Sequence, residues 1–569
     1  MDTKGLAWWR NSIGYIIYPE SFKDSNDDGV GDIRGIVSKL DYLKELGVNL
    51  LWICPLFKSP MDDGGYDVSD YRQINPRFGT MEDFDDLLSE AHKRGIRILI
   101  DFVLNHTSDE HPWFQTAIRD PGSKERGYYF FREGRKANGK ELPPNNWKGF
   151  FSTSAWERLP GSDLYYLHIF SKKMPDVNWA NPELRERYFE IARFYLDKGV
   201  DGFRLDAVAH LAKDLSFADS AGQPDEDGFV YDTSKFSNRP ELFDYLQMLK
   251  KNVFSHYDCL TVGEAGGNIS PQDALKMADR QNGSINLVFN FDTVWDNGNY
   301  GSIDKGDQDI RTDVISLKDN FMRWYEVCHE RADMPLYWCN HDHPRVVSQY
   351  GSIAFRAESA KMLFNTILFL YGTPFIYNGE EIGMSNVNYA RCEDFFSDVG
   401  TRNDVASLRS RGYDDGKILG YLNRTSRVNA RTPMQWDRTR YAGFSAHRGV
   451  NRVNDNYLSG VNVADEMADP WSILNFYQYA IGLRKDPVIN EQVLEGRLEI
   501  VDHGHPDVFA YLHDGKDKLM VISNFRPYQV YFSFYYALGD VLLHNYDQVL
   551  LSDHVFALRP FETYLLRLR

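Results

Sequence analysis

The segment Gly202-Phe203-Arg204-Leu205-Asp206-Ala207 decides the fold that the sequence predicts. It follows an amphipathic stretch that ends at Gly199, so a helix is expected to lead directly into it. The segment is typical of a buried strand with polar residues at its C-terminal end. Arg204 and Asp206 are two residues apart and therefore share one face of that strand. They could form a purely structural ion pair, or the arginine could keep a catalytic carboxylate ionised.

The same alternation of helix and buried strand extends along much of the chain. Strands are predicted at residues 12–19, 48–54, 96–104, 201–206, 260–264, 285–291, 335–341 and 373–377, with amphipathic segments between them. Apolar strands that alternate with helices indicate a parallel sheet covered on both faces. Eight such units favour a closed barrel, and an open doubly wound sheet is less favoured because no GxGxxG follows the first strand.

Two insertions and a terminal region interrupt this alternation. The predicted fold class is α/β: a (β/α)8 TIM barrel with an inserted domain after the third strand and a C-terminal antiparallel β domain. The expected boundaries are 1–106 and 177–485 for the two parts of the barrel, 107–176 for the inserted domain and 486–569 for the β domain. A further polar insertion is expected near 384–469.

Composition and charge indicate which partners and which cellular compartment the protein is expected to have. The chain has 569 residues and a formal net charge of −18 with its acids widely spread, which disfavours nucleic acid and anionic membranes as partners. The five cysteines are scattered and odd in number, which fits free thiols in a reducing compartment. Because the N-terminus also shows no apolar signal segment, a soluble cytoplasmic protein is expected. The sequence leaves the oligomeric state open.

Four of the predicted strands end in polar residues. These ends carry Asp101 with Asn105 and His106, Arg204 with Asp206, Glu264, and the tripeptide Asn340-His341-Asp342. Chemistry in such barrels lies at the C-terminal ends of the strands, so these side chains are expected to meet at one mouth. Asp206 could attack an anomeric carbon, and Glu264 could protonate the leaving oxygen and then activate water. Asp342 could bind sugar hydroxyls more tightly in the transition state, with His106 and His341 as further donors.

An acidic loop after the first strand is a candidate cation site. Oxygen-bearing side chains alternate at positions 24, 26, 28 and 32, and Gly29 and Gly31 let the loop curl. Hard oxygen ligands of this kind suit Ca²⁺, although a solvated acidic turn is the simpler alternative. A structural calcium ion is therefore predicted.

Several motifs resemble those of a known family. The segments DFVLNH (101–106), GFRLDAVAH (202–210), the segment around Glu264, and NHD (340–342) resemble the four signature regions of glycoside hydrolase family 13, the α-amylase family. HTSDEHPWF (106–114), YYLHIFSKK (165–173), NGEEIGM (378–384) and ARTPMQW (430–436) are similar to its oligo-1,6-glucosidase and α-glucosidase group. The resemblance covers nearly the whole chain.

This resemblance implies a retaining α-glucosidase. Asp206 would be the nucleophile, Glu264 the acid/base and Asp342 the transition-state stabiliser. Asp63 and Arg431 match the pair that grips the non-reducing glucose, which implies exo-attack on a small oligosaccharide. The remaining implied roles are a stacking aromatic at Tyr66, pocket walls at Phe151 and Phe170, an entrance arginine at Arg427, and calcium ligands at Asp24, Asn26, Asp28, the Val30 carbonyl and Asp32.

Linkage preference is the finest prediction. In the group that the chain resembles, Val after the nucleophile goes with α-1,6 cleavage and a smaller residue goes with α-1,4, so Ala207 implies maltose-type substrates. Met174, His343 and the Ala-Gly-Gly segment at 265–267 depart from the group's pattern. The alternatives are an oligo-1,6-glucosidase, or a glucosyltransferase or sugar isomerase of the trehalose or isomaltulose type. A catalytically inactive carbohydrate-binding protein is disfavoured because all three carboxylates are present.

Overall fold

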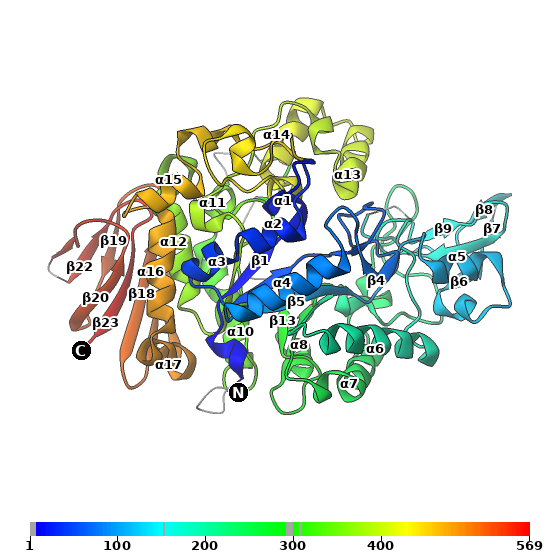
Figure 1. The fold of residues 1–569 in the computed structure, drawn as a ribbon, viewed down its shortest axis with the longest axis horizontal. Helices are drawn as coiled ribbons and strands as arrows, with labels where there is room; N and C mark the ends of the chain where they lie inside the picture. The colour runs from blue at the N-terminus through cyan, green and yellow to red at the C-terminus, as the bar shows by residue number, and fades with distance from the viewer. Residues whose placement is uncertain (1–6, 138, 152–153, 292–299, 306–309, 553) are drawn as a thin grey trace.

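An eight-stranded parallel sheet forms the centre of the molecule (Figure 1). The computed structural model describes residues 7–137, 139–151, 154–291, 300–305, 310–552 and 554–569. The strands are β1 (Gly14–Ile17), β2 (Leu50–Ile53), β5 (Arg97–Val103), β11 (Gly202–Asp206), β12 (Leu260–Glu264), β13 (Leu287–Phe289), β14 (Pro335–Leu336) and β15 (Thr373–Tyr377). Their order is β13-β12-β11-β5-β2-β1-β15-β14, and the end strands β13 and β14 lie side by side. The sheet therefore nearly closes, which confirms the predicted barrel.

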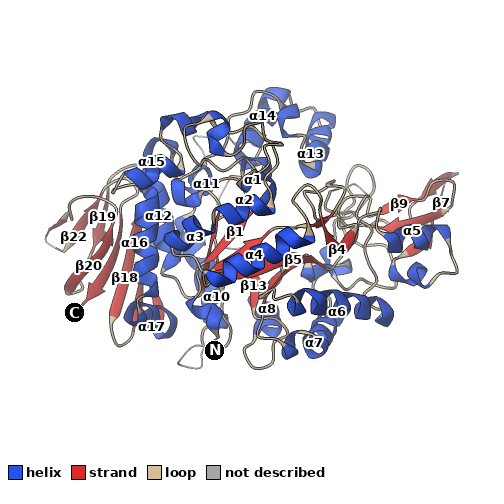
Figure 2. Ribbon diagram, in the orientation of Figure 1, coloured by secondary structure: helices blue, strands red, loops and turns tan. Residues whose placement is uncertain are grey.

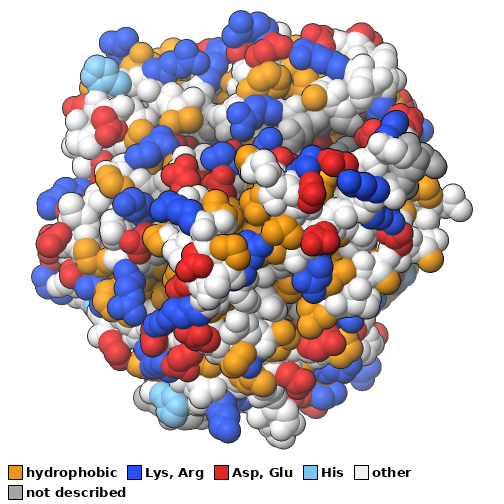
Figure 3. Space-filling model, turned by 90° about the vertical axis from the view of Figure 1, so that its right-hand side faces the viewer, with side chains coloured by type: hydrophobic (Ala, Val, Ile, Leu, Met, Phe, Trp, Pro, Cys, Tyr) orange, Lys and Arg blue, Asp and Glu red, His pale blue; other side chains and the backbone are white. Residues whose placement is uncertain are grey.

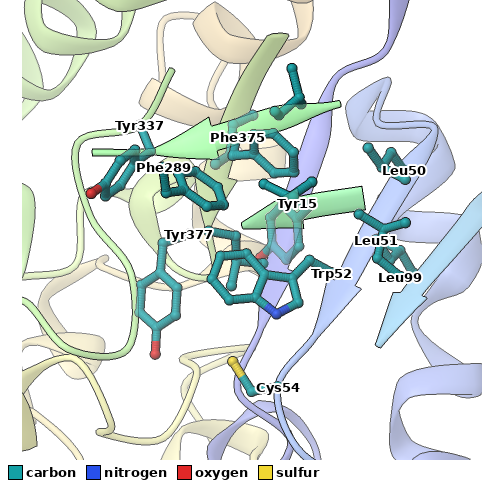
Figure 4. Close-up of a cluster of buried hydrophobic side chains, with 14 of the residues drawn as sticks. Tyr15, Leu50, Leu51, Trp52, Cys54, Leu99, Phe289, Tyr337, Phe375 and Tyr377 are labelled. Carbon is teal, nitrogen blue, oxygen red and sulfur yellow. The ribbon is translucent and has the colours of Figure 1, made fainter. Parts of the chain in front are cut away.

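Aromatic side chains fill the inside of this barrel (Figure 4). The ring of Phe289 lies 5.4 Å from that of Trp52, 5.3 Å from Phe375 and 4.9 Å from Tyr337, measured between ring centroids. These residues come from or follow four different strands, so they tie the barrel together across its interior. A Cβ atom on Gly14 would lie 2.4 Å from the Phe375 ring, which explains why β1 begins with glycine.

Helices surround the sheet, as expected for alternating β and α units (Figure 2). The longer ones are α4 (Met81–Lys93), α6 (Pro182–Asp197), α7 (Pro240–Asn252), α8 (Pro271–Ala278), α10 (Val314–Cys328), α12 (Arg356–Leu368) and α16 (Ile473–Lys485). Their starts follow from the sequence: Thr80 and Asp83 form a capping box for α4, and Asn181 caps α6. The segment 33–47 forms two helices, α2 (Ile33–Ser38) and α3 (Leu40–Leu46), rather than one.

The two insertions, 107–176 and the polar one near 384–469, lie at the C-terminal ends of the barrel strands (Figure 1). The first contains α5 (Pro112–Arg119), a sheet of β6 (Phe131–Glu133), β10 (Leu164–Leu167) and β9 (Trp156–Arg158), and the hairpin β7 (Arg135–Ala137) and β8 (Lys140–Leu142). The second contains α13 (Val399–Ser410), α14 (Asp415–Thr425) and α15 (Val463–Ala468). Each has its own small hydrophobic cluster, so each is stabilised by local packing in addition to its contacts with the barrel.

The C-terminal region is an antiparallel β domain. One sheet contains β16 (Arg497–Val501), β17 (Val508–Asp514), β18 (Lys518–Asn524), β23 (Thr563–Leu568) and β20 (Leu538–His544); the other contains β19 (Val530–Ser533), β22 (Val555–Leu558) and β21 (Leu551–Ser552). Along β17, Phe509 and Tyr511 join the barrel's core, whereas Val508 and Ala510 join the core between the two sheets. This alternation fixes the domain against the barrel. A helix, α17 (Pro487–Glu495), precedes the first strand.

Two predicted strands are shorter in the structure than in the sequence pattern. The seventh ends at Leu336 instead of residue 341, and the sixth covers only Leu287–Phe289. Near His341 the Asp342 amide donates to the Asn340 Oδ1 atom (2.8 Å), and this local turn replaces strand pairing. His341 and Asp342 therefore lie in the loop after β14.

All five cysteines are buried and free of disulfides. Within the described residues, no helix is both long and apolar enough to cross a membrane. Figure 3 shows acidic and basic side chains interspersed on one face of the molecule.

Candidate active site

Arg204 joins three carboxylates at the C-terminal ends of neighbouring strands. Its Nη1 atom binds Asp101 Oδ1 (2.8 Å) and Asp206 Oδ1 (2.5 Å), and its Nη2 atom binds Glu264 Oε1 (2.8 Å). The strands supply this geometry, because β11 pairs with β5 on one side and β12 on the other. The Asp101 side chain is completely buried, whereas those of Asp206 and Glu264 are 10% and 17% exposed. Asp101 is therefore structural, and the other two carboxylates can meet a ligand.

The Glu264 carboxylate is also held by the backbone of the residue that follows Asp206. The Ala207 amide donates to Glu264 Oε2 at 3.0 Å. Ala207 adopts φ 47° and ψ 31°, a left-handed conformation that is unfavourable for side chains larger than glycine's. The sharp turn after the strand thus fixes the relative positions of Asp206 and Glu264.

Burial controls the protonation of this cluster. Burial raises the pKa of the Asp206 carboxyl well above its usual value, the Arg204 guanidinium opposes the rise, and the neighbouring carboxylates add to it. One cation cannot neutralise three buried carboxylates. Asp206 consequently retains its proton to a higher pH than an isolated aspartic acid does.

Arg427 and Arg431 form a second charged cluster beside the first. Arg427 binds Asp63 Oδ1 (2.6 Å), Asp342 Oδ1 (2.8 Å) and Asp398 Oδ1 (2.6 Å). Arg431 donates to Asp342 Oδ1 (2.9 Å) through Nη2 and to the His341 carbonyl (3.0 Å) through Nε. Arg427, expected near the entrance, is thus the ion-pair partner of Asp63, while Arg431 pairs with Asp342.

Two carboxylates of this second cluster show the opposite pKa shift, whereas burial raises the pKa of the third, Asp63, against the opposing effect of the two arginines. Burial favours the neutral form of Asp342, but His341, Arg427 and Arg431 outweigh it and hold the pKa of Asp342 well below its usual value. Burial likewise opposes ionisation of Asp398, yet the two arginines lower its pKa to about 2. Both carboxylates are therefore fixed negative charges at neutral pH.

Tyr66 and His341 connect the two clusters. The Tyr66 hydroxyl donates to Asp101 Oδ2 (3.1 Å) and lies 2.7 Å from His341 Nε2, which is 3.0 Å from Asp342 Oδ2. The Tyr66 and His341 rings are stacked, with centroids 5.3 Å apart. Tyr18, which the sequence did not single out, also stacks with the His341 ring, with centroids 6.0 Å apart.

His106 has a defined tautomer. The Lys213 ammonium donates to Asn105 Oδ1 (2.8 Å), so the Asn105 amide nitrogen faces His106 Nδ1 at 3.2 Å. Burial lowers the pKa of His106 to about 3 and the Lys213 charge adds to this, while a contact with the Tyr66 backbone opposes it. The neutral ring therefore carries its proton on Nε2, a buried atom with no well-formed hydrogen bond within the described residues. It can donate to a ligand.

Phe151 and Phe170 complete the group of predicted site residues. The ring of Phe170 lies 5.3 Å from His106 and 5.6 Å from Phe151, and the Arg427 guanidinium lies 5.4 Å from the Phe151 ring. The first insertion thus contributes aromatic side chains beside the second charged cluster. Every predicted catalytic and substrate-binding residue belongs to this one connected group, with Asp101, Asp398 and Tyr18 as additional members.

Two of the three departures from the group's pattern lie in the core. Met174 and His343 are fully buried, and burial lowers the pKa of His343 to about 4. Gly267 has φ 68°, and a Cβ atom there would lie 2.6 Å from the Ser237 Cβ atom. The glycine at 267 is thus explained by its conformation and by its close approach to Ser237.

The acidic loop lies apart from the charged clusters. Asp24 accepts hydrogen bonds from the Asn26, Asp27 and Gly29 amides (2.9, 2.8 and 2.7 Å). Asp32 accepts from Ser25 and caps α2 through Gly35. Among the residues that the structure describes, no three His, Cys, Asp or Glu side chains are grouped as a metal site. The loop's carboxylates are thus satisfied largely by its own backbone, and calcium binding stays a prediction.

Comparisons with known proteins agree with this geometry. Residues 16–492 match the family described as "Alpha amylase, catalytic domain". The chain is 40% identical to an oligo-1,6-glucosidase of Bacillus cereus, over 99% of both chains, and 40% identical to an alpha-glucosidase of Pediococcus pentosaceus, over 92% of both. The crystal structure of an isomaltulose synthase from Klebsiella sp. LX3 superposes with a TM-score of 0.91 at 35% identity, covering 99% of this chain and 100% of that one. Likeness of this extent shows that the chain belongs to the α-amylase family, glycoside hydrolase family 13, and is an enzyme of that family.

Proposed function

We propose that this enzyme is a retaining, exo-acting α-glucosidase that cleaves glucose from the non-reducing end of short oligosaccharides. The observation that carries the proposal is that one guanidinium binds both Asp206 and Glu264, each on its own strand end. Two carboxylates held so close suit a retaining mechanism, in which one is the nucleophile.

In the first step Asp206 attacks the anomeric carbon, and a protonated Glu264 gives its proton to the leaving oxygen. In the second step Glu264 takes a proton from water, and the resulting hydroxide displaces Asp206 from the sugar. The Ala207 amide holds Glu264 next to Asp206, so the same carboxyl group can serve in both steps.

The second cluster would bind the glucose unit. Asp63, Asp342 and Arg431 would present polar groups to its hydroxyl groups, with His106 and His341 as further donors. Tyr66, Phe151 and Phe170 would contribute apolar surface to the faces of the sugar.

We propose that the enzyme prefers α-1,4 linkages, because Ala207 leaves space that a branched side chain would fill. The names of several relatives indicate α-1,6 cleavage instead, so linkage needs direct measurement. A second candidate is a sugar isomerase or glucosyltransferase, which the likeness to the isomaltulose synthase supports. A cytoplasmic location fits the five buried free thiols.

The decisive experiment incubates the enzyme with nitrophenyl α-glucoside, maltose, isomaltose, sucrose and maltotriose and resolves all products. Glucose released first as the α-anomer, one unit at a time, supports the proposal. Inversion at the anomeric carbon, or attack inside maltotriose analogues blocked at the non-reducing end, contradicts it. Predominant transfer to sugar at high substrate concentration would establish the second candidate.

A further inference from the structure

Arg427 binds the two carboxylates that the proposed function assigns to the glucose unit. Its Nη2 atom donates a hydrogen bond to Asp63 Oδ1, and its Nη1 atom donates one to Asp342 Oδ1. The other oxygen of Asp342 already faces His341 Nε2. Glucose hydroxyls must therefore share or displace hydrogen bonds of Arg427, so the position of this guanidinium affects substrate affinity.

Asp398 binds Arg427 as well, and it shares the Arg427 Nη2 atom with Asp63, at 2.6 Å from each. Its Oδ1 atom accepts from Arg427 Nε (2.7 Å), and its Oδ2 atom accepts from the Thr401 amide (2.7 Å) and hydroxyl (2.8 Å). Asp398 is 3% exposed and is the N-cap of α13. Because the helix cap fixes one oxygen, the other cannot move with Arg427.

The same helix also contacts the first insertion. The Asn403 amide donates to the Phe151 carbonyl at 2.6 Å, and the Thr401 hydroxyl lies 3.3 Å from the Ser426 hydroxyl, next to Arg427. The N-terminal part of α13 thus contacts Arg427 through its buried cap and Phe151 through the exposed Asn403.

Resting on the proposed function, we propose that Asp398 is a positioning residue that draws Arg427 away from Asp63 and Asp342 and so sets the affinity for the non-reducing glucose. Without the Asp398 charge, Arg427 retains only Asp63 and Asp342 as carboxylate partners among these contacts. It then binds them more firmly and competes with the sugar.

The test is the variant Asp398→Asn, whose amide oxygen can still cap α13 but carries no charge. We expect KM for maltose to rise about tenfold, the equivalent of one charge-assisted hydrogen bond, with kcat changed less than threefold. Asp415→Asn is the matched control, because it removes an exposed carboxylate from Arg409 in the same insertion. Its KM should stay at the wild-type value.

A double-variant cycle separates positioning from a merely structural role. In an Arg427→Gln background, Asp398→Asn should leave KM unchanged, because the group through which it acts is gone. An unchanged or lower KM in the single variant, or an equal rise in both backgrounds, overturns the proposal. If the wild type cleaves no glucoside at all, the proposed function fails instead. The coupling between Asp398 and Arg427 is then measured from the rise in melting temperature that glucose causes in the wild type, the two single variants and the double variant. Additive effects of the two substitutions on this rise would overturn the proposed role of Asp398.

Discussion

The two charged clusters of the site are built from the same residue types but behave oppositely. The Arg204 cluster has one arginine for Asp101, Asp206 and Glu264. The second cluster has two arginines for Asp63, Asp342 and Asp398. The pKa of Asp206 is raised in the first, whereas in the second those of Asp342 and Asp398 are lowered and that of Asp63 is raised by burial.

The number of cations per carboxylate explains the difference. Both clusters are buried, and burial alone favours the neutral acid in each. Where one guanidinium serves three carboxylates, the pKa of Asp206 is raised. Where two guanidinium groups and a histidine surround the carboxylates, Asp342 and Asp398 stay charged, and only Asp63 has a raised pKa. The first cluster therefore suits acid–base chemistry, and the second suits binding.

The strongest test of this division removes the reacting groups. Asp206→Ala and Glu264→Gln should each lower kcat for maltose by roughly 10⁴-fold or more, because nucleophile and acid/base act as a unit. Circular dichroism and the melting temperature must show an intact fold. Near-normal turnover by Asp206→Ala with the anomeric outcome of the wild type would remove Asp206 from the proposed mechanism.

The next effect concerns linkage, at Ala207, which lies between the two carboxylates proposed to be catalytic. Ala207→Val should shift the ratio of kcat/KM for maltose over isomaltose toward isomaltose, by the ~1–3 kcal/mol that a methyl-sized difference supplies. The structure adds a complication, because valine in the left-handed conformation of Ala207 costs about 1–2 kcal/mol.

Stability must therefore be measured beside the two rate constants. Ala207→Ser, which is not branched, is the matched control and should leave the ratio near that of the wild type. A wild type that prefers isomaltose, or a ratio that Ala207→Val leaves unmoved, would contradict the steric explanation.

The sequence predicted the first cluster more completely than the second. Arg204, Asp206 and Glu264 stand at strand ends, and the barrel pattern alone brings them together. Asp398 comes from an insertion whose position no periodicity indicates. Its only local signal is a helix cap three residues before Thr401. Pairings such as Asp63 with Arg427, 364 residues apart, depend on how loops pack.

A smaller effect is expected on stability, with opposite signs in the two clusters. The lowered pKa of Asp398, about 2, means that its contribution is fully present above the ordinary pKa near 3.8 and is lost as pH falls toward 2. Asp398→Asn should therefore cost about 2 kcal/mol at pH 7 and much less at pH 2–3.

The raised pKa of Asp206 has the reverse sign. Ionising this carboxyl costs folding free energy at neutral pH, and the cost declines as pH falls below the folded-state pKa and is gone below the ordinary pKa near 3.8. Asp206→Asn should accordingly raise the melting temperature at pH 7 while abolishing turnover. Melting curves of both variants between pH 3 and 7 test the contrast, and a loss of stability in Asp206→Asn at pH 7 would contradict it.

The smallest effect is expected from removal of a metal ion from the acidic loop. The loss of stability should affect the contact between this loop and the second insertion. The acidic loop contacts the second insertion, because the Asp24 amide donates to the Phe444 carbonyl (3.1 Å) and Asp27 accepts from the Ala446 amide (3.0 Å). This insertion also carries Arg427 and Arg431. A cation bound only by the folded loop would stabilise that contact by linkage. Its oxygen ligands would be Asp24, Asn26, Asp28, the Val30 carbonyl and Asp32.

Chelation should then lower the melting temperature by a few degrees, with calcium restoring it, while kcat for maltose at moderate temperature changes little. Because the loop's carboxylates already bind backbone amides, it should stay folded without metal. An unchanged melting temperature in protein shown by elemental analysis to have lost its calcium, or protein that never contains calcium, would show that the loop is a solvated acidic turn.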